Sequence, residues 1–177
     1  AGNALGYILN EAHTTGDGTG DPNGIVTASA EGVVGTAADG VATYDEIVDL
    51  VYSTDPAIRQ RATSGFMVST GAAAELRKLK DGDNRFLYEL RVGEPDQFMG
   101  FRVNENVHMA APDEDAKSIL FGDLNNYKVR LAGGIQVAQS ADYAFNTDVT
   151  TFRVIARADG DLANANSVKH FIGKAAA

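Results

Sequence analysis

The 177-residue chain is 44% hydrophobic and 22% charged, which is an ordinary composition for a globular domain. It contains no cysteine, so disulfides and thiolate metal sites are excluded. No apolar run reaches the ~20 residues that span a bilayer, and we expect no membrane contact.

The net charge of −9 is concentrated in the first third of the chain. No Lys or Arg precedes Arg59, and the remaining 15 acidic residues balance the 15 basic ones. The nine early carboxylates are Glu11, Asp17, Asp21, Glu31, Asp39, Asp45, Glu46, Asp49 and Asp55. Such a region repels nucleic acid and has no phosphate-binding footprint, so we interpret it as a solvated acidic face.

Residues 3–13 predict an amphipathic helix, because Leu5, Ile8 and Leu9 fall on one stripe at helical spacing. The glycine-rich stretch TTGDGTGDPNGIV, residues 14–26, then ends this helix. Since the chain begins inside a helix, we expect it to be part of a longer polypeptide whose missing part lies upstream.

The glycine-rich stretch fails the tests for three kinds of ligand loop. A dinucleotide-binding loop follows a strand, whereas this one follows a helix, and no Lys is near to complete a P-loop. A calcium loop starting at Asp17 would need Gly at its sixth position and Glu at its twelfth, where Pro22 and Ala28 stand. We therefore interpret the stretch as a hinge, and we expect no cofactor and no metal.

Three helix starts follow. Residues 27–42 indicate a loop with at most a short strand. Thr43 and Glu46 have capping-box spacing and predict a helix, and Asp55-Pro56 opens a second, short one. Thr70 is predicted to cap a third helix, which ends at Asp81-Gly82.

Strands are predicted mainly in the second half. Their ranges are 65–69, 99–106, 118–124, 150–160 and, near the end, 167–172. Alternating segments also flank Gly133-Gly134, which predicts a hairpin turning at these glycines. In the strand over 150–160, Phe152 and Val154 are expected on one side and Arg153 on the other. Because helices come early and strands late, the predicted class is α+β.

No catalytic constellation is visible. His13, His108 and His170 lie far apart in the sequence and show no metal-binding spacing, and no serine stands in a nucleophile elbow. We predict no catalytic residues and no enzymatic activity, which leaves a structural or binding role. A small ligand-binding domain or hydrolase with a site near Asp123 and His108 is the alternative of another class.

Five stretches, in order, carry a family resemblance. They are GDGTGDPNGI, GFMVSTGAAAELRKLKDGDNRFLY, FMGFRVNENVHM, ILFGDLNNYKVRLAGGIQV and FRVIARADGDLANANSVKHF. Together they cover most of residues 3–173 and resemble the major capsid protein of tailed bacteriophages, which has the Hong Kong-type shell fold. No one stretch is specific, but their common order is.

The resemblance implies a phage capsid fold with two domains. Residues 1–43, containing the end of a spine helix and the glycine-rich bend, and residues 139–177, containing terminal strands, would form a peripheral domain with a long β-sheet. Residues 44–138 would form an axial domain, a central sheet flanked by helices. In some relatives a Lys of an extended loop is crosslinked to an Asn of a neighbouring subunit. Asn146 or Asp148 lies near the position expected for that acceptor.

The resemblance also implies a function. Subunits would self-assemble into hexamers and pentamers of an icosahedral shell that encloses double-stranded DNA without specific binding. The virion would be assembled in the bacterial host cytoplasm, with portal, scaffold or decoration proteins as further partners. The acidic first third would face the packaged DNA or meet a basic surface of an adjacent subunit. An encapsulin-like compartment shell is the alternative with the same fold.

Overall fold

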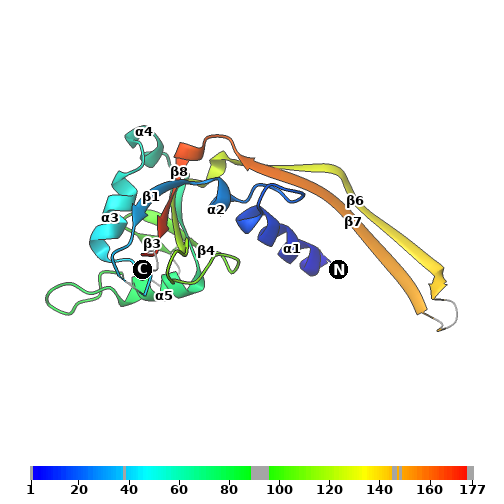
Figure 1. Ribbon diagram of the computed structural model, residues 1–177, viewed down its shortest axis with the longest axis horizontal. Helices are drawn as coiled ribbons and strands as arrows, with labels where there is room; N and C mark the ends of the chain where they lie inside the picture. The colour runs from blue at the N-terminus through cyan, green and yellow to red at the C-terminus, as the bar shows by residue number, and fades with distance from the viewer. Residues whose placement is uncertain (1, 38, 89–95, 145–146, 148, 175–177) are drawn as a thin grey trace.

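A computed structural model describes residues 2–174, apart from 38, 89–95, 145–146 and 148. Figure 1 shows a body built on one sheet and a long two-stranded arm that leaves it, with helix α1 (Gly2–Thr15) beside the base of the arm. The mixture of helices and strands confirms the predicted α+β class. None of the helices in the described ranges is long and apolar enough to cross a membrane.

The body is organised around a six-stranded sheet. In spatial order its strands are β1 (Ala30–Val34), β8 (Val168–Ile172), β5 (Ile119–Asp123), β2 (Ser64–Val68), β4 (Phe101–Glu105) and β3 (Gln97–Phe98). The pairs β1–β8 and β2–β4 are parallel, and the other three pairs are antiparallel. The last strand of the chain therefore lies inside the sheet, between β1 and β5.

Both faces of the sheet carry a hydrophobic cluster. On the first face Phe66 and Phe121 pack 4.8 Å apart between ring centroids, beneath α3 (Tyr44–Tyr52) and α5 (Thr70–Lys78). On the second face Leu120 and Val168 pack against α2 (Ile25–Ala28) and the base of the arm. Because side chains alternate along a strand, the neighbours Leu120 and Phe121 supply opposite faces.

The helix starts follow the local capping chemistry. The predicted capping box is confirmed, since the Glu46 amide donates to Thr43 Oγ1 at 3.4 Å and the Thr43 amide donates to Glu46 Oε2 at 2.8 Å. The short helix α4 (Pro56–Arg59) starts where predicted, with the Ala57 amide donating to Asp55 Oδ1 at 2.7 Å. Each cap satisfies an amide that the first helical turn leaves unpaired.

Both predicted ends of α5 were wrong. Its N-cap is Ser69, whose hydroxyl accepts from the Ala72 amide at 3.2 Å, and Thr70 is the first helical residue. The helix ends at Lys78, because Leu79 takes an extended backbone and packs against the first cluster. Burial of Leu79 thus ends the helix before the Asp81-Gly82 turn signal is reached.

The predicted hairpin at Gly133-Gly134 was also wrong. Strand β6 (Tyr127–Ala144) runs through both glycines and pairs with β7 (Val149–Leu162) over its whole length. The glycines have φ of 73° and 66°, and the register shifts there from Ala132↔Arg157 to Gln136↔Ile155. A bulge and a tight turn both require positive φ, so the same glycine pair suits either.

Candidate functional site

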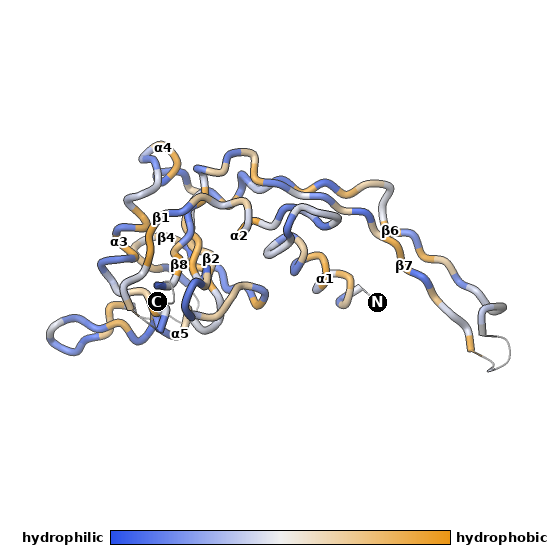
Figure 2. Tube along the Cα trace, in the orientation of Figure 1, coloured by the Kyte–Doolittle hydropathy of each residue, from blue (hydrophilic) through white to orange (hydrophobic). Residues whose placement is uncertain are grey.

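The arm formed by β6 and β7 has an apolar face. Residues that pair across an antiparallel ladder share a face, and Val137 pairs with Val154 while Leu131 pairs with Ala158. By this register the face, called here the arm's apolar face, contains Val129, Leu131, Ile135, Val137, Phe152 and Val154. Each of these six side chains is at least 37% exposed. Figure 2 shows the alternation of hydrophobic and hydrophilic residues along both strands.

The opposite face of the arm is mainly polar and charged, although it also carries Ile155. Lys128 stands across from Asp161, and Arg130 from Asp159, so opposite charges face each other between the strands. Further out, Arg153 pairs with Ala138 on this face. The predicted separation of Phe152 and Val154 from Arg153 is therefore confirmed.

The apolar face is covered only near the body. Tyr127 and Leu162, at the base of the arm, pack into the second cluster with Ile25. Beyond that point the face extends into solvent, as the outline in Figure 1 shows. A contiguous exposed apolar surface is unusual on a monomeric protein and indicates a binding partner.

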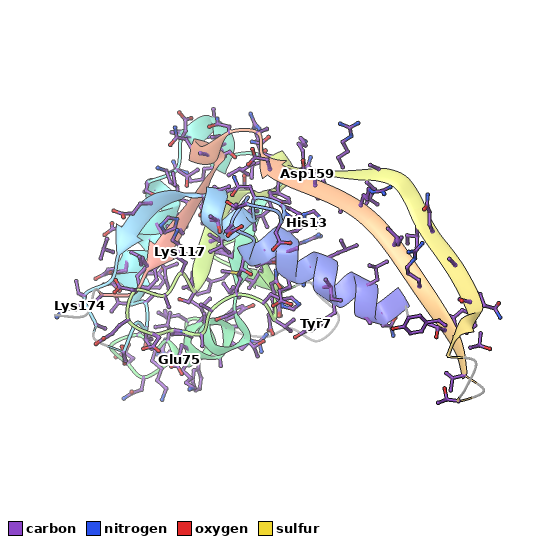
Figure 3. All side chains as sticks on the ribbon, turned by 45° about the vertical axis from the view of Figure 1, so that its right-hand side comes forward. Tyr7, His13, Glu75, Lys117, Asp159 and Lys174 are labelled. Atoms are coloured by element: carbon purple, nitrogen blue, oxygen red, sulfur yellow. The ribbon has the colours of Figure 1, made fainter. Side chains whose placement is uncertain are left out.

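A hydrogen-bonded junction fixes the arm to α1 and to the glycine-rich loop. The Tyr127 hydroxyl donates to the Asn23 carbonyl at 2.9 Å, so the His13 Nδ1–H must donate to Tyr127 Oη, 3.1 Å away. Asn23 Nδ2 donates to Asp161 Oδ1 at 2.9 Å, and the Asn23 amide donates to the Gly160 carbonyl at 3.0 Å. In Figure 3, His13 on α1 lies below the strand that carries Asp159.

The electrostatics of the junction keep both rings uncharged at neutral pH. Burial, with the nearby Asp161 and Asp159, raises the pKa of Tyr127 to about 12. Burial lowers the pKa of His13 below its ordinary 6.5, against the attraction of Asp159. The junction is therefore a set of hydrogen bonds between uncharged rings at neutral pH.

The glycine-rich loop acts as the predicted bend. The Gly16 amide donates to the Ala12 carbonyl at 3.0 Å and ends α1, and the Gly24 amide donates to the Gly16 carbonyl at 2.9 Å. A Cβ at Gly24 would lie 2.6 Å from the Thr14 carbonyl oxygen, so the chain can pass here only with glycine. Within the described residues, no three His, Asp or Glu side chains gather in a way that could hold a metal.

The structure does not bring Asp123 and His108 together. Asp123 pairs with Ser64 at the start of β2, whereas His108 follows β4, whose last residue pairs with Val68 at the other end of β2. Asp123 accepts hydrogen bonds from Thr63 at 2.7 Å and Arg61 at 2.8 Å. Burial acts to raise the pKa of Asp123, but these bonds outweigh it and hold the pKa below its ordinary value. Asp123 is thus a buried ion-pair partner, and the predicted alternative of a shared site has no geometric basis.

His108 packs its ring against Tyr7 of α1, with 4.2 Å between centroids. His170 is buried on β8, where its Nδ1 lies 2.9 Å from Ser29 Oγ. The three histidines therefore occupy three separate places. The possible crosslink positions Asn146 and Asp148 lie outside the described residues.

Sequence reasoning missed the residues that build the junction. Tyr127 falls in the alternating segment before Gly133, and Asn23 in the glycine-rich stretch, and neither position carries a sequence signal for the junction. Their partners are more than 100 residues away in the chain. No local pattern could have found them.

Comparisons with known proteins agree with this architecture. The capsid of an empty GTA particle is 28% identical with a TM-score of 0.81, covering 98% of this chain and 64% of that chain. The capsid of a native GTA particle is 27% identical with a TM-score of 0.85, covering 98% and 63%. A chain of Gordonia phage Cozz, 17% identical with a TM-score of 0.66 and coverage of 99% and 61%, shares the fold.

This chain spans less than two thirds of the length of these relatives. No curated protein matches it. Its sequence matches the Phage capsid family over residues 1–172, nearly the entire length. The chain belongs to the phage capsid family.

Proposed function

We propose that this chain is part of a major capsid subunit that assembles with its own copies into hexamers and pentamers of an icosahedral shell around double-stranded DNA. Membership in the phage capsid family supports a structural role as a shell subunit. The arm is the observation that carries the proposal. A partner would bury its apolar face, and the most abundant partner in a shell is another copy of the subunit.

The arm suits assembly for a physical reason. Val137 and Phe152 are 67% and 63% exposed, which lowers the solubility of an isolated chain. When a neighbour covers these side chains, the burial of apolar surface stabilises the contact. Each such contact is small, but every subunit in a closed shell is held by several neighbours at once. Weak contacts repeated in this way give a stable particle that can still correct errors during assembly.

The division into domains is part of the proposal. We assign the body to the capsomer centre, and α1 together with the arm to the periphery. This assignment replaces the domain boundaries expected after residues 43 and 138. The topology supports this assignment, because β1 and β8 share one sheet with β2, β4 and β5 while β6 continues through residue 138.

Partners and location follow from the same proposal. The subunit resides in the virion and is assembled in the bacterial host cytoplasm, with portal, scaffold or decoration proteins as additional partners. DNA is enclosed without specific binding, and the acidic first third supports this, because its eight exposed carboxylates, without any Lys or Arg, repel phosphate. It performs no catalysis.

Electron microscopy of the full-length source polypeptide tests the proposal. Closed shells or six-membered rings are expected for the wild-type chain. The variant Val137→Asp should lower their yield strongly, because it places a charge on the arm's apolar face. Gln136→Asp is the matched control, since Gln136 pairs with Ile155 on the opposite face. Discrete small particles at every salt concentration would contradict the proposal, and equal losses in both variants would remove the arm's apolar face as its basis.

A further inference from the structure

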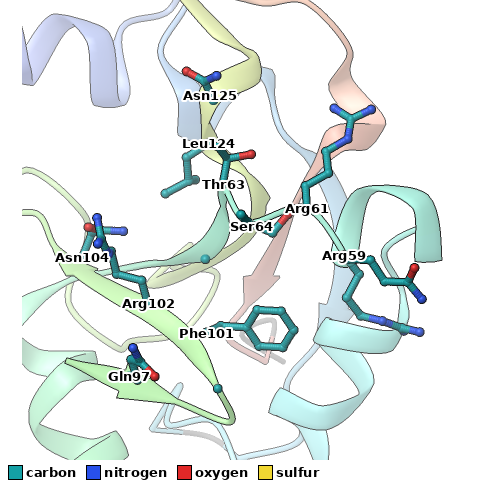
Figure 4. Close-up of a pocket in the computed structure, with 14 residues that line it drawn as sticks. Arg59, Arg61, Thr63, Ser64, Gln97, Phe101, Arg102, Asn104, Leu124 and Asn125 are labelled. Carbon is teal, nitrogen blue, oxygen red and sulfur yellow. The ribbon is translucent and has the colours of Figure 1, made fainter. Parts of the chain in front are cut away.

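The second face of the sheet is only partly covered. Helix α2 and the base of the arm cover β5 and β8, and Met67 of β2 packs against the same cluster, whereas Arg102 and Asn104 of β4 are exposed. Arg102 and Asn104 flank the buried Val103 on β4, so both point to this open side. Together with residues 59–65 and Asn125 they line a groove of about 890 Å³, called here the arginine groove (Figure 4).

The arginine groove is cationic in a chain of net charge −9. Its lining includes Arg59, Arg61 and Arg102 and no carboxylate. Arg61 pairs with Asp123 at 2.8 Å, but half of its side chain remains exposed. Arg59 lies over the Tyr52 ring at 4.3 Å, and neither Arg59 nor Arg102 has an ion pair within the described residues. The groove therefore presents unneutralised positive charge beside polar side chains.

A complementary acidic surface lies on α3. Asp45 and Asp49 are four residues apart and share the exposed side of the helix, opposite the buried Ile47 and Leu50. Neither aspartate has an ion pair in the part of the chain that the structure describes. The arginine groove adjoins this helix without overlapping the acidic surface, because Arg59 lies over the ring of Tyr52, the last residue of α3.

We propose that the arginine groove receives the α3 acidic surface, Asp45 and Asp49, of a second copy of this chain. The proposal rests on the proposed function. The acidic surface of one copy would meet the groove of the next, which is a head-to-tail contact between two different surfaces, and such a contact closes into a ring when its rotation divides the circle. Opposite charges at the contact fix its register and disfavour wrong pairings.

Nucleic acid fits the groove less well. It offers three arginines, one already paired, and no lysine, whereas the rest of the surface repels phosphate. A helix with two aspartates matches the two arginines, Arg59 and Arg102, that have no ion pair among the described residues.

Charge reversal in the full-length polypeptide tests the contact. Arg102→Glu and Asp49→Arg are each expected to lower the yield of rings or shells roughly tenfold at low salt, and the combined variant is expected to restore it, because the reversed pair attracts again. Arg85→Glu and Asp83→Arg are the controls. Both residues are exposed in the loop after α5 and outside the arginine groove. Thermal unfolding of each variant confirms that the body is folded.

The outcomes separate the two proposals. Wild-type rings with unaffected Arg102→Glu and Asp49→Arg variants would overturn this contact and leave the proposed function standing. Two defective single variants without restoration in the combined variant would also overturn it, since the surfaces would then have different partners. Normal rings that package less DNA in Arg102→Glu would assign the groove to phosphate instead. Absence of wild-type rings would overturn both proposals together.

Discussion

The body and the arm are built from the same kinds of residue but reach stability in different ways. In the body, Phe66, Phe121 and Phe171 have no exposed surface. In the arm, Phe152 and Val137 are more than 60% exposed, although their strands pair over 12 registered positions. The body buries its own apolar side chains, whereas the arm has extensive backbone pairing and an uncovered apolar face. Backbone hydrogen bonding thus shapes an element whose apolar side chains stay exposed in the isolated chain.

Truncation of a phenylalanine in each region gives the largest contrast. Phe66→Ala should lower the free energy of unfolding by about 3–5 kcal/mol, because it leaves a cavity among packed aromatic rings. Phe152→Ala should change it by less than about 0.5 kcal/mol and reduce shell yield instead. Urea unfolding and electron microscopy of both variants measure this, and comparable losses of stability would erase the distinction.

Acidification should affect the body through His170. Burial, together with Lys117 and Lys169, lowers its pKa from the ordinary 6.5 to about 4, although a hydrogen bond with Ser29 opposes the shift. The unfolded chain therefore takes up this proton first as the pH falls. Stability is full above pH ~6.5 and is lost progressively toward pH ~4, by up to about 3 kcal/mol.

Comparison with His170→Asn isolates this contribution from the carboxylates that titrate nearby. Asn keeps a polar partner for Ser29 Oγ but does not titrate. Unfolding by urea at pH 7 and pH 4.5 should show a smaller loss in the variant than in the wild type. Equal losses in the two proteins would mean that His170 is not the sensitive group.

The junction between the two regions should give an intermediate effect. Tyr127→Phe removes the hydroxyl that joins His13 to the Asn23 carbonyl, at a cost of about 1–2 kcal/mol. The loss should be local, with faster hydrogen exchange at the Asn23 amide, which bonds to Gly160. Tyr143→Phe is the control, because Tyr143 on the arm is 83% exposed. Unchanged exchange at Asn23 would show that the junction does not hold the arm.

The smallest expected effect concerns the start of α5. Ser69→Ala should cost about 1 kcal/mol, since it removes the acceptor of the Ala72 amide. Thr70→Ala should cost much less, because Thr70 is exposed and already helical. Thermal unfolding of both variants measures the difference. A larger loss of stability in Thr70→Ala would identify Thr70 as the N-cap.

Local chemistry predicted the body better than the arm. The capping box at Thr43, the Asp55-Pro56 helix and the strand around Phe66 follow from neighbouring residues, and all three are present. The prediction for the end of α5 was wrong, because Leu79 packs against the first cluster instead of continuing the helix. The hairpin prediction at Gly133-Gly134 was wrong, because the choice between a turn and a bulge depends on pairing with β7, which begins 15 residues later.

The assembly surfaces were predictable only in part. The two-sided character of the strand around Phe152 was visible in its alternation, and so was the acidic first third. The arginine groove was not, because Arg59 and Arg102 are 43 positions apart and meet only through the sheet order. The junction at Tyr127 likewise joins three segments that no local pattern connects.

The place of β8 inside the sheet has a consequence for biosynthesis. Residues 168–172 lie between β1 and β5, so the emerging chain leaves a gap in the sheet until these residues have left the ribosome. A polypeptide released early lacks an interior strand, including the fully buried Phe171, and cannot close the body. A chain that stops before residue 168 therefore keeps an incomplete sheet and is exposed to proteolysis.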